Sequence, residues 1–252
     1  STNSGMTSNH DHDIYATYAN VAANSASFVG GKYTFTPSLS ATLYAGELED
    51  IWRQYYTNLN YVIPLSHDQS LALDGNLYRT LDTGSAKAGA INNTTYSVAA
   101  AYSFLAAHTL TLSYQKVHGD TPFDYIGTGN NGAGEGGDSV LLANSIQWGD
   151  FNGPGEQSWG IRYDLNMATF GVPGLSFMTR YVSGSGANTG TTSNGKEWER
   201  DIEAKYVIQS GPAKDRSLRV RQATYRSSDG VYYGSASIDE LRLIAQYPLN
   251  IL

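Results

Sequence analysis

A recurring alternation of apolar and polar residues, with a period of two, constrains this chain more than any other feature. In the segment 158–166, Trp159 and Ile161 fall on one face, whereas Arg162 and Asp164 fall on the other. Successive side chains of an extended strand point to opposite faces, so the pattern predicts half-buried β-strands. The alternation recurs in segments 39–44, 59–63, 71–78, 96–104, 109–115, 175–182, 201–209, 217–223 and 241–247. It predicts about eleven or twelve strands of about 9–11 residues, the length that a tilted strand needs to cross a bilayer.

The connectors between these segments alternate in length. Short connectors lie at 36–38, 64–68, 105–107, 170–174 and 211–216, and long polar ones lie at 81–93, 119–157, 184–197 and 227–239. Outer-membrane barrels sort their loops in this way, with tight turns on the periplasmic rim and long loops outside. Only the link 46–53 is short for its expected place on the outer rim. The connectors therefore predict an all-β fold, a transmembrane antiparallel β-barrel.

A soluble β-sandwich or solenoid would also produce alternating strands. The apolar face of such a fold is a core that favours Val, Ile and Leu. In this chain the apolar face is rich in Tyr, Trp and Ala, and several tyrosines stand near predicted strand ends, namely Tyr163, Tyr181, Tyr206 and Tyr247. A lipid-facing band with an aromatic girdle has this composition, so the membrane barrel is the favoured interpretation.

Composition excludes several classes of protein. Cysteine is absent, which rules out disulfides and thiolate metal sites. No apolar run approaches the 18 or so residues of a membrane helix, and a net charge of −7 argues against binding to nucleic acid. The charge is also uneven: residues 1–161 carry −9 and residues 162–252 carry +2. Such asymmetry predicts different surroundings for the two parts of the chain.

Several blocks of sequence carry a family resemblance. The segments 144–159 (NSIQWGDFNGPGEQSW), 171–181 (GVPGLSFMTRY), 203–207 (EAKYV) and 210–215 (SGPAKD) closely resemble the OprD family of outer-membrane channels. The blocks 47–54 (ELEDIWRQ) and 241–252 also resemble this family. Within it, the segments 124–131 (DYIGTGNN) and 136–144 (GGDSVLLAN) look most like the OpdK-type branch, which is associated with small, often aromatic, monocarboxylates.

The resemblance implies a monomeric barrel of about 18 strands. This chain is too short for that and looks like the C-terminal two thirds, with about eleven or twelve strands and no N-terminal wall. An incomplete barrel would leave unpaired strand edges in lipid, so we interpret residues 1–252 as part of a larger single β-barrel domain. Residues 1–23 are expected to form either one strand or an external loop.

Six cations share strand faces with small or polar neighbours, opposite the apolar face. Each would cost about 2–4 kcal/mol near the middle of the lipid face, so they are predicted to point into the lumen. An arginine fork binds a carboxylate through two parallel hydrogen bonds, and a row of such forks suits a permeating anion. The resemblance implies the same basic row. The alternative is that these side chains only pair with wall carboxylates such as Asp164, Glu203 or Glu240. The six are Arg162, Arg180, Lys205, Arg219, Arg221 and Arg242.

The connector 119–157, at about 39 residues, far exceeds an ordinary loop. Its apolar stretch 140–143 would be buried if the loop folded into the pore. By resemblance, Ser145 and Asp150 match loop positions that face the basic row across a constriction. Asp150 could instead simply cap a turn.

These features predict a channel for passive uptake of small carboxylates, and not an enzyme. The expected partners are anionic solutes, outer-membrane lipid and lipopolysaccharide, with no cofactor, metal or nucleic acid. The alternative is an outer-membrane barrel enzyme of the lipase or protease type. That class needs a Ser–His pair at the rim or on the lipid-facing side, and no such pair can be assembled from this sequence.

Overall fold

Eleven long strands dominate the computed structural model, which describes residues 14–128, 140–228 and 237–247. The prediction of about eleven or twelve strands is confirmed in kind, although several run longer than the alternation indicated. The strands are β3 (Ala26–Thr36), β4 (Leu39–Leu48), β5 (Trp52–Ser66), β6 (Gln69–Asp82), β7 (Asn92–Phe104), β8 (His108–His118), β10 (Gln157–Asn166), β11 (Leu175–Ala187), β12 (Gly195–Val207), β13 (Ser217–Ser227) and β14 (Ser237–Gln246).

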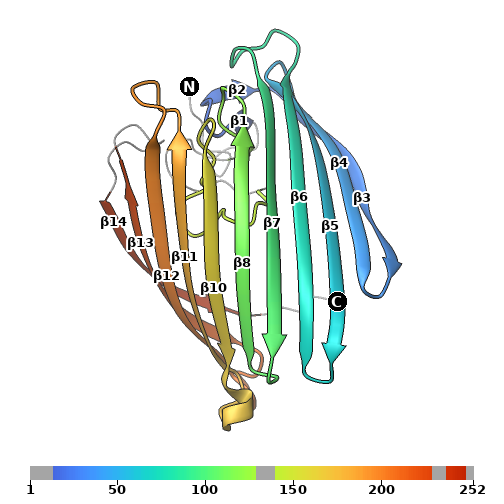
Figure 1. Cartoon of the computed structure of the whole chain (residues 1–252), viewed down its shortest axis with the longest axis vertical. Coiled ribbons are helices and arrows are strands. Elements are labelled where there is room, and N and C mark those ends of the chain that lie inside the picture. Colours follow the sequence, from blue (N-terminus) through green and yellow to red (C-terminus); the bar gives the residue numbers. More distant parts are fainter. Residues whose placement is uncertain (1–13, 129–139, 229–236, 248–252) are drawn as a thin grey trace.

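These strands form one antiparallel sheet in the order β14-β13-β12-β11-β10-β8-β7-β6-β5-β4-β3. Each pairs with the neighbouring long strands along the chain, whether the connection between them is short or long. Figure 1 shows the sheet as a curved wall with β3 and β14 at its two margins and with the long connections gathered at one end. Within the described residues no pairing joins β3 to β14, so these two strands are the edges.

The link between β4 and β5 is shorter than the sequence indicated. The expected connector 46–53 is only Glu49–Ile51 in the structure, because β5 begins at Trp52. The alternation of β5 was recognised only over 59–63 because Trp52 and Tyr56, which lie on the polar-side parity, are large and aromatic. Both are buried, since they pack in clusters with residues of other segments.

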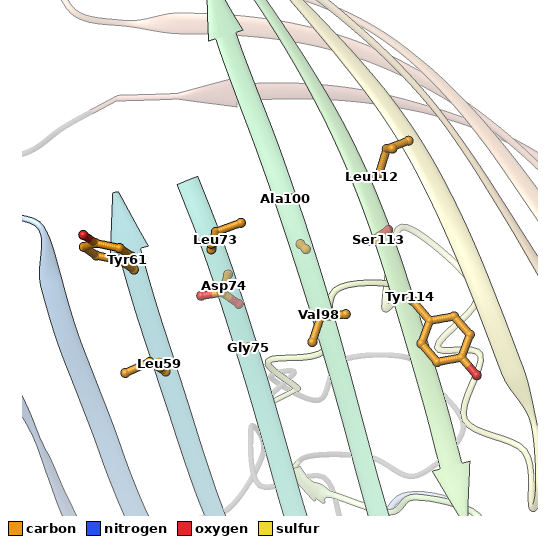
Figure 2. A pocket seen from close by; sticks show the side chains of 11 residues that line it. Leu59, Tyr61, Leu73, Asp74, Gly75, Val98, Ala100, Leu112, Ser113 and Tyr114 are labelled. Atoms are coloured by element: carbon orange, nitrogen blue, oxygen red, sulfur yellow. The ribbon is translucent and has the colours of Figure 1, made fainter. Parts of the chain in front are cut away.

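The outer face of the sheet is apolar and exposed. A hollow of about 610 Å³ lies on this face between β5 and β8, and Figure 2 shows Leu59, Leu73 and Leu112 around it. Gly75 and Ala100 contribute its floor because they carry little or no side chain.

The inner face is the face against which residues 140–156 pack, and it buries polar side chains. Ser97, Gln115 and Glu199 are fully buried there, and each accepts a hydrogen bond from a backbone N–H of that segment. Pairing of this kind is what allows polar groups to be buried.

A second sheet of three short strands joins the N-terminal segment to the long connection that follows β8. It joins β2 (Val21–Ala23), β1 (Ile14–Ala16) and β9 (Ile126–Thr128) in that order. The part of 1–23 that the structure describes is therefore a short hairpin outside the main sheet, and residues 1–13 lie outside the described residues. Among the described residues the single helix is the short 3-10 turn η1 (Met167–Phe170). The described part of the chain therefore has no helix long and apolar enough to cross a membrane.

Candidate functional site

The predicted cations lie next to one another on β10 to β14. Strand register places Arg162 opposite Arg180, and Arg221 opposite Arg242. Lys205 stands opposite Arg219 on β12 and β13. Arg242 also donates to the backbone oxygen of Gln147 at 3.4 Å, which fixes this row on the inner face beside the segment 140–156. Strand pairing therefore arranges the six residues as three cross-strand pairs on β10 to β14.

Each arginine of the row has a carboxylate partner. Five salt bridges join the arginines to four carboxylates, and Glu203 serves two of them. Their N–O distances are 2.7 Å for Arg162–Asp164, 2.5 Å for Arg180–Asp201, 3.4 Å for Arg219–Glu203, 2.6 Å for Arg221–Glu203 and 2.9 Å for Arg242–Glu240. The structure thus contains the wall pairing that the alternative interpretation invoked. Lys205 makes no salt bridge within the described part of the chain, and its side chain is half-buried.

The pairs differ in how much of the cation remains accessible. The side chain of Arg162 is 46% exposed and that of Arg242 is 40% exposed, whereas that of Arg180 is 13% exposed and its partner Asp201 is fully buried. Breaking a buried pair costs far more than exchanging a partner at an exposed one. Arg180–Asp201 therefore holds two strands together, whereas the side chains of Arg162 and Arg242 remain partly exposed.

Asp150 lies at the centre of a hydrogen-bonded group formed by two loops. Its carboxylate accepts hydrogen bonds from the hydroxyls of Tyr18 at 2.6 Å, Tyr125 at 2.9 Å and Ser145 at 2.5 Å. Ser145 and Asp150 thus lie together. Within the described residues, the hydrogen bonds of their side chains join them to each other and to the two tyrosines, and to none of the six cations.

Two buried side chains of the sheet hold this segment in place. Gln115 on β8 donates to the backbone oxygens of Asp150 at 2.8 Å and of Phe151 at 2.9 Å. Glu199 on β12 accepts from the backbone N–H of Trp148 at 3.0 Å and of Gly149 at 2.6 Å. The backbone on both sides of the Asp150 carboxylate is therefore attached to the inner wall.

Asp124 positions the tyrosines that contact Asp150. Its carboxylate accepts backbone N–H groups of Tyr18 at 2.9 Å, Ala19 at 3.1 Å and Tyr125 at 2.8 Å. Burial raises the pKa of Asp124 above its usual value of 3.8, against the lowering effect of these N–H groups. A carboxylate with several N–H donors can remain buried, and here it ties the N-terminal segment to residues 124–125.

A cavity of about 360 Å³ lies between the arginines and the loop segment. Arg162, Arg180, Asp74 and Asp164 contribute its charged groups, and Ile146 belongs to the loop side. Positively and negatively charged side chains therefore line the same cavity.

Tyr18, Gln115, Asp124, Tyr125 and Glu199 were missed in the sequence. Each acts through a partner far away in the chain, and the two ends of the Tyr18–Asp150 bond are 132 residues apart. For these residues, the one local feature of the sequence was the pair Asp124-Tyr125, which stands in a polar segment without strand alternation. No cluster of three metal-binding side chains occurs in the described segments.

Comparison with known proteins places this arrangement in a family. A sequence model of the outer membrane porin family OprD matches residues 1–251. The chain belongs to the OprD family. It is thus a protein of the bacterial outer membrane, and its relatives are porins rather than enzymes. Its sheet is part of a β-barrel, which confirms the predicted fold class.

The OprD relatives show how much of a complete protein the chain represents. It is 58% identical to Porin D of Pseudomonas aeruginosa, over 95% of this chain and 56% of Porin D. It is 35% identical to the porin-like protein GalP of Pseudomonas putida, over 89% of this chain and 51% of GalP. The chain therefore spans about half the length of these curated relatives.

Solved structures give the same result for the fold. A crystal structure of Pseudomonas aeruginosa OprD superposes with a TM-score of 0.86 and 56% identity, over 96% of this chain and 65% of that chain. For Pseudomonas aeruginosa OccK9 (OpdG) the TM-score is 0.82 and the identity 34%, over 93% and 57% of the two chains. The higher identity is with OprD itself, so these comparisons lend no support to the likeness to the OpdK-type branch.

Proposed function

We propose that the complete protein is a monomeric channel for passive, substrate-specific uptake of small carboxylates, aromatic monocarboxylates among them. Arg162, Arg180, Lys205, Arg219, Arg221 and Arg242 provide the guiding row. Ser145 and Asp150 belong to the opposing loop wall, in a segment 119–157 that narrows the pore. Residues 129–139 of this segment lie outside the described residues.

The cavity that Arg162 and Arg180 share with the loop supports this proposal most directly. In an outer-membrane barrel the apolar face contacts lipid, and the opposite face lines water. A carboxylate that enters this cavity meets two guanidinium groups on neighbouring strands, which offer bidentate hydrogen bonds that no pH change removes.

The existing ion pairs are compatible with transport. Arg180 donates to Asp201 through Nε at 2.5 Å, and a guanidinium carries four further N–H groups. Arg162 engages Asp164 through Nε and one terminal nitrogen, which leaves its other terminal nitrogen for a solute. A wall carboxylate that competes for the same cation also weakens solute binding, and transport requires solutes to leave as well as to enter.

Removal of two neighbouring arginines tests the proposal. Arg219→Ala with Arg221→Ala is expected to slow benzoate entry into proteoliposomes several-fold, while an uncharged sugar of similar size enters at the wild-type rate. Glu203→Gln is added in the same background, because Glu203 loses both partners. Arg200→Ala with Arg226→Ala is the matched control, since these arginines have the opposite parity on the same two strands. Equal benzoate rates in all variants would reject the basic row.

A zwitterion is a second candidate solute. Asp74 and Asp164 line the same cavity as the two arginines, so an ammonium and a carboxylate of one molecule both find partners there. Swelling rates for glycine and acetate in wild type and in Asp74→Asn separate the two candidates. Only a zwitterionic solute should be slowed by loss of the Asp74 charge.

A further inference from the structure

A second inner-face cavity, separate from the one at the arginines, has a volume of about 370 Å³. We propose that it binds the aromatic ring of a permeating solute. It lies beside β3, β4, β5 and β6 and is closed in part by Leu141 of the connection 119–156. The side chains that matter for the argument are Phe28, Tyr44, Trp52, Tyr56, Tyr78 and Leu141.

Two of the three tyrosine hydroxyls of this lining, those of Tyr56 and Tyr78, already have hydrogen-bond partners. Tyr56 donates to the side-chain oxygen of Asn76 at 2.7 Å, and the Tyr78 hydroxyl accepts the backbone N–H of Leu141 at 3.0 Å. The rings themselves remain as the surface of the cavity. Aromatic faces and edges favour another ring in an offset or edge-on arrangement, so the lining suits an aromatic group better than a sugar.

Trp52 adds a buried indole ring to this lining. It is 2% exposed, and its Nε1 atom is shielded from solvent, so the indole contributes an apolar ring and not a hydrogen-bond donor to the cavity.

The size agrees with a single ring. A dry apolar cavity of about 150 Å³ is enough to hold benzene, and ligand pockets usually measure about 300–1,000 Å³. The cavity at 370 Å³ has room for one ring and a short substituent.

An aromatic path joins this cavity to Asp150. Tyr78 packs on Phe123 with ring centroids 4.7 Å apart, and Phe123 packs on Tyr125 at 6.4 Å. The Tyr125 hydroxyl then donates to Asp150. A ring held in the cavity thus lies beside the loop segment that the proposed channel passes. This inference deepens the proposed function and rests on it for the path of the solute, although ring binding itself needs no basic row.

Gly46 gives a direct test, because it lines the cavity and a Cβ there would meet only ordinary contacts at 3.5 and 3.7 Å. The full-length protein is reconstituted in planar bilayers, and block of the small-ion current is titrated with benzoate, acetate and uncharged benzyl alcohol. In wild type, benzoate and benzyl alcohol should block at about tenfold lower concentration than acetate, the factor expected for burying one ring. Gly46→Leu should remove that advantage and leave acetate block unchanged. Gly31→Leu is the matched control, since a Cβ on Gly31 meets nothing within 4 Å and has outward parity on β3.

The outcomes separate this site from the basic row. Block by benzyl alcohol that survives Arg219→Ala with Arg221→Ala but disappears in Gly46→Leu supports the ring site, even if the basic row fails its own test. Equal block by benzoate and acetate in wild type overturns the ring site, even if acetate still depends on the arginines. This comparison needs only the wild-type protein, so the proposal can be rejected even if Gly46→Leu folds poorly.

Discussion

The Glu199 carboxylate accepts the backbone N–H of Gly149 at 2.6 Å and thereby connects β12 to the residue that precedes Asp150. The same carboxylate also accepts the N–H of Trp148. This wall side chain, together with Gln115 on β8, holds the backbone beside the Asp150 carboxylate. We therefore expect changes at this anchor to alter conductance and selectivity.

Glu199→Ala is expected to release the loop beside Asp150. Two backbone N–H groups lose their acceptor, and each such loss costs on the order of 1–3 kcal/mol when the group is buried. Single-channel recording should show a larger and noisier conductance than in wild type. Glu47→Ala, at an exposed position on β4, should behave as wild type. A wild-type conductance in Glu199→Ala would show that Gln115 alone holds the segment.

Asp150→Asn tests the negative charge of the carboxylate that accepts the three hydroxyl hydrogen bonds. The amide keeps an oxygen for Tyr18, Tyr125 or Ser145 but removes a negative charge from the loop. Anions should then pass more readily, and the anion-to-cation permeability ratio should rise by a factor of about two to five at low salt. Reversal potentials in a salt gradient give this ratio. Asp215→Asn in the exposed link 208–216 is the control. An unchanged ratio would place Asp150 away from the ion path.

Glu156 predicts a pH dependence of stability. Burial, and after it the neighbouring Glu197, raises the pKa of Glu156 well above its usual value of 4.5. The folded protein therefore binds this proton more tightly than the unfolded chain does. The contribution to stability is greatest below pH 4.5 and is lost as the pH rises through the raised pKa. Glu156→Gln should lessen the fall in urea midpoint between pH 5 and pH 9. Parallel curves for the variant and the wild type would contradict this.

Adjacent residues on β6 test which face meets lipid. Leu73 lies on the outer face beside the hollow of Figure 2, and Ala72 has inner-face parity. Leu73→Arg should lower the free energy of unfolding in lipid vesicles by about 2–4 kcal/mol, because the charge enters hydrocarbon. Ala72→Arg should change it much less, since the inner face is wet. Equal effects would mean that the two faces are not distinguished by lipid.

Local pattern was sufficient for most of the strands and for the strand face on which each cation lies. The pleat puts alternate side chains on opposite faces, so the parity of Arg162, Arg180 and Arg221 could be read without any knowledge of distant contacts. Short links leave the antiparallel strands that they join little choice of partner, whereas the pairing of β8 with β10 spans a long connection. The start of β5 was mistaken where Trp52 and Tyr56 broke the alternation, because those rings pack against other segments and not against water.

The partners of these side chains depended on tertiary structure. Nothing near Arg180 in the chain announces Asp201, and nothing near Asp150 announces Tyr18, because hydrogen bonds between loops and walls join residues that only folding brings together. The aromatic cavity arises in the same way, from four strands of the main sheet and a loop. Alternation along a strand is a local consequence of backbone geometry, so it can be read from the sequence. A site depends on contacts between residues far apart in the chain, and local alternation does not indicate which loops will contact each other.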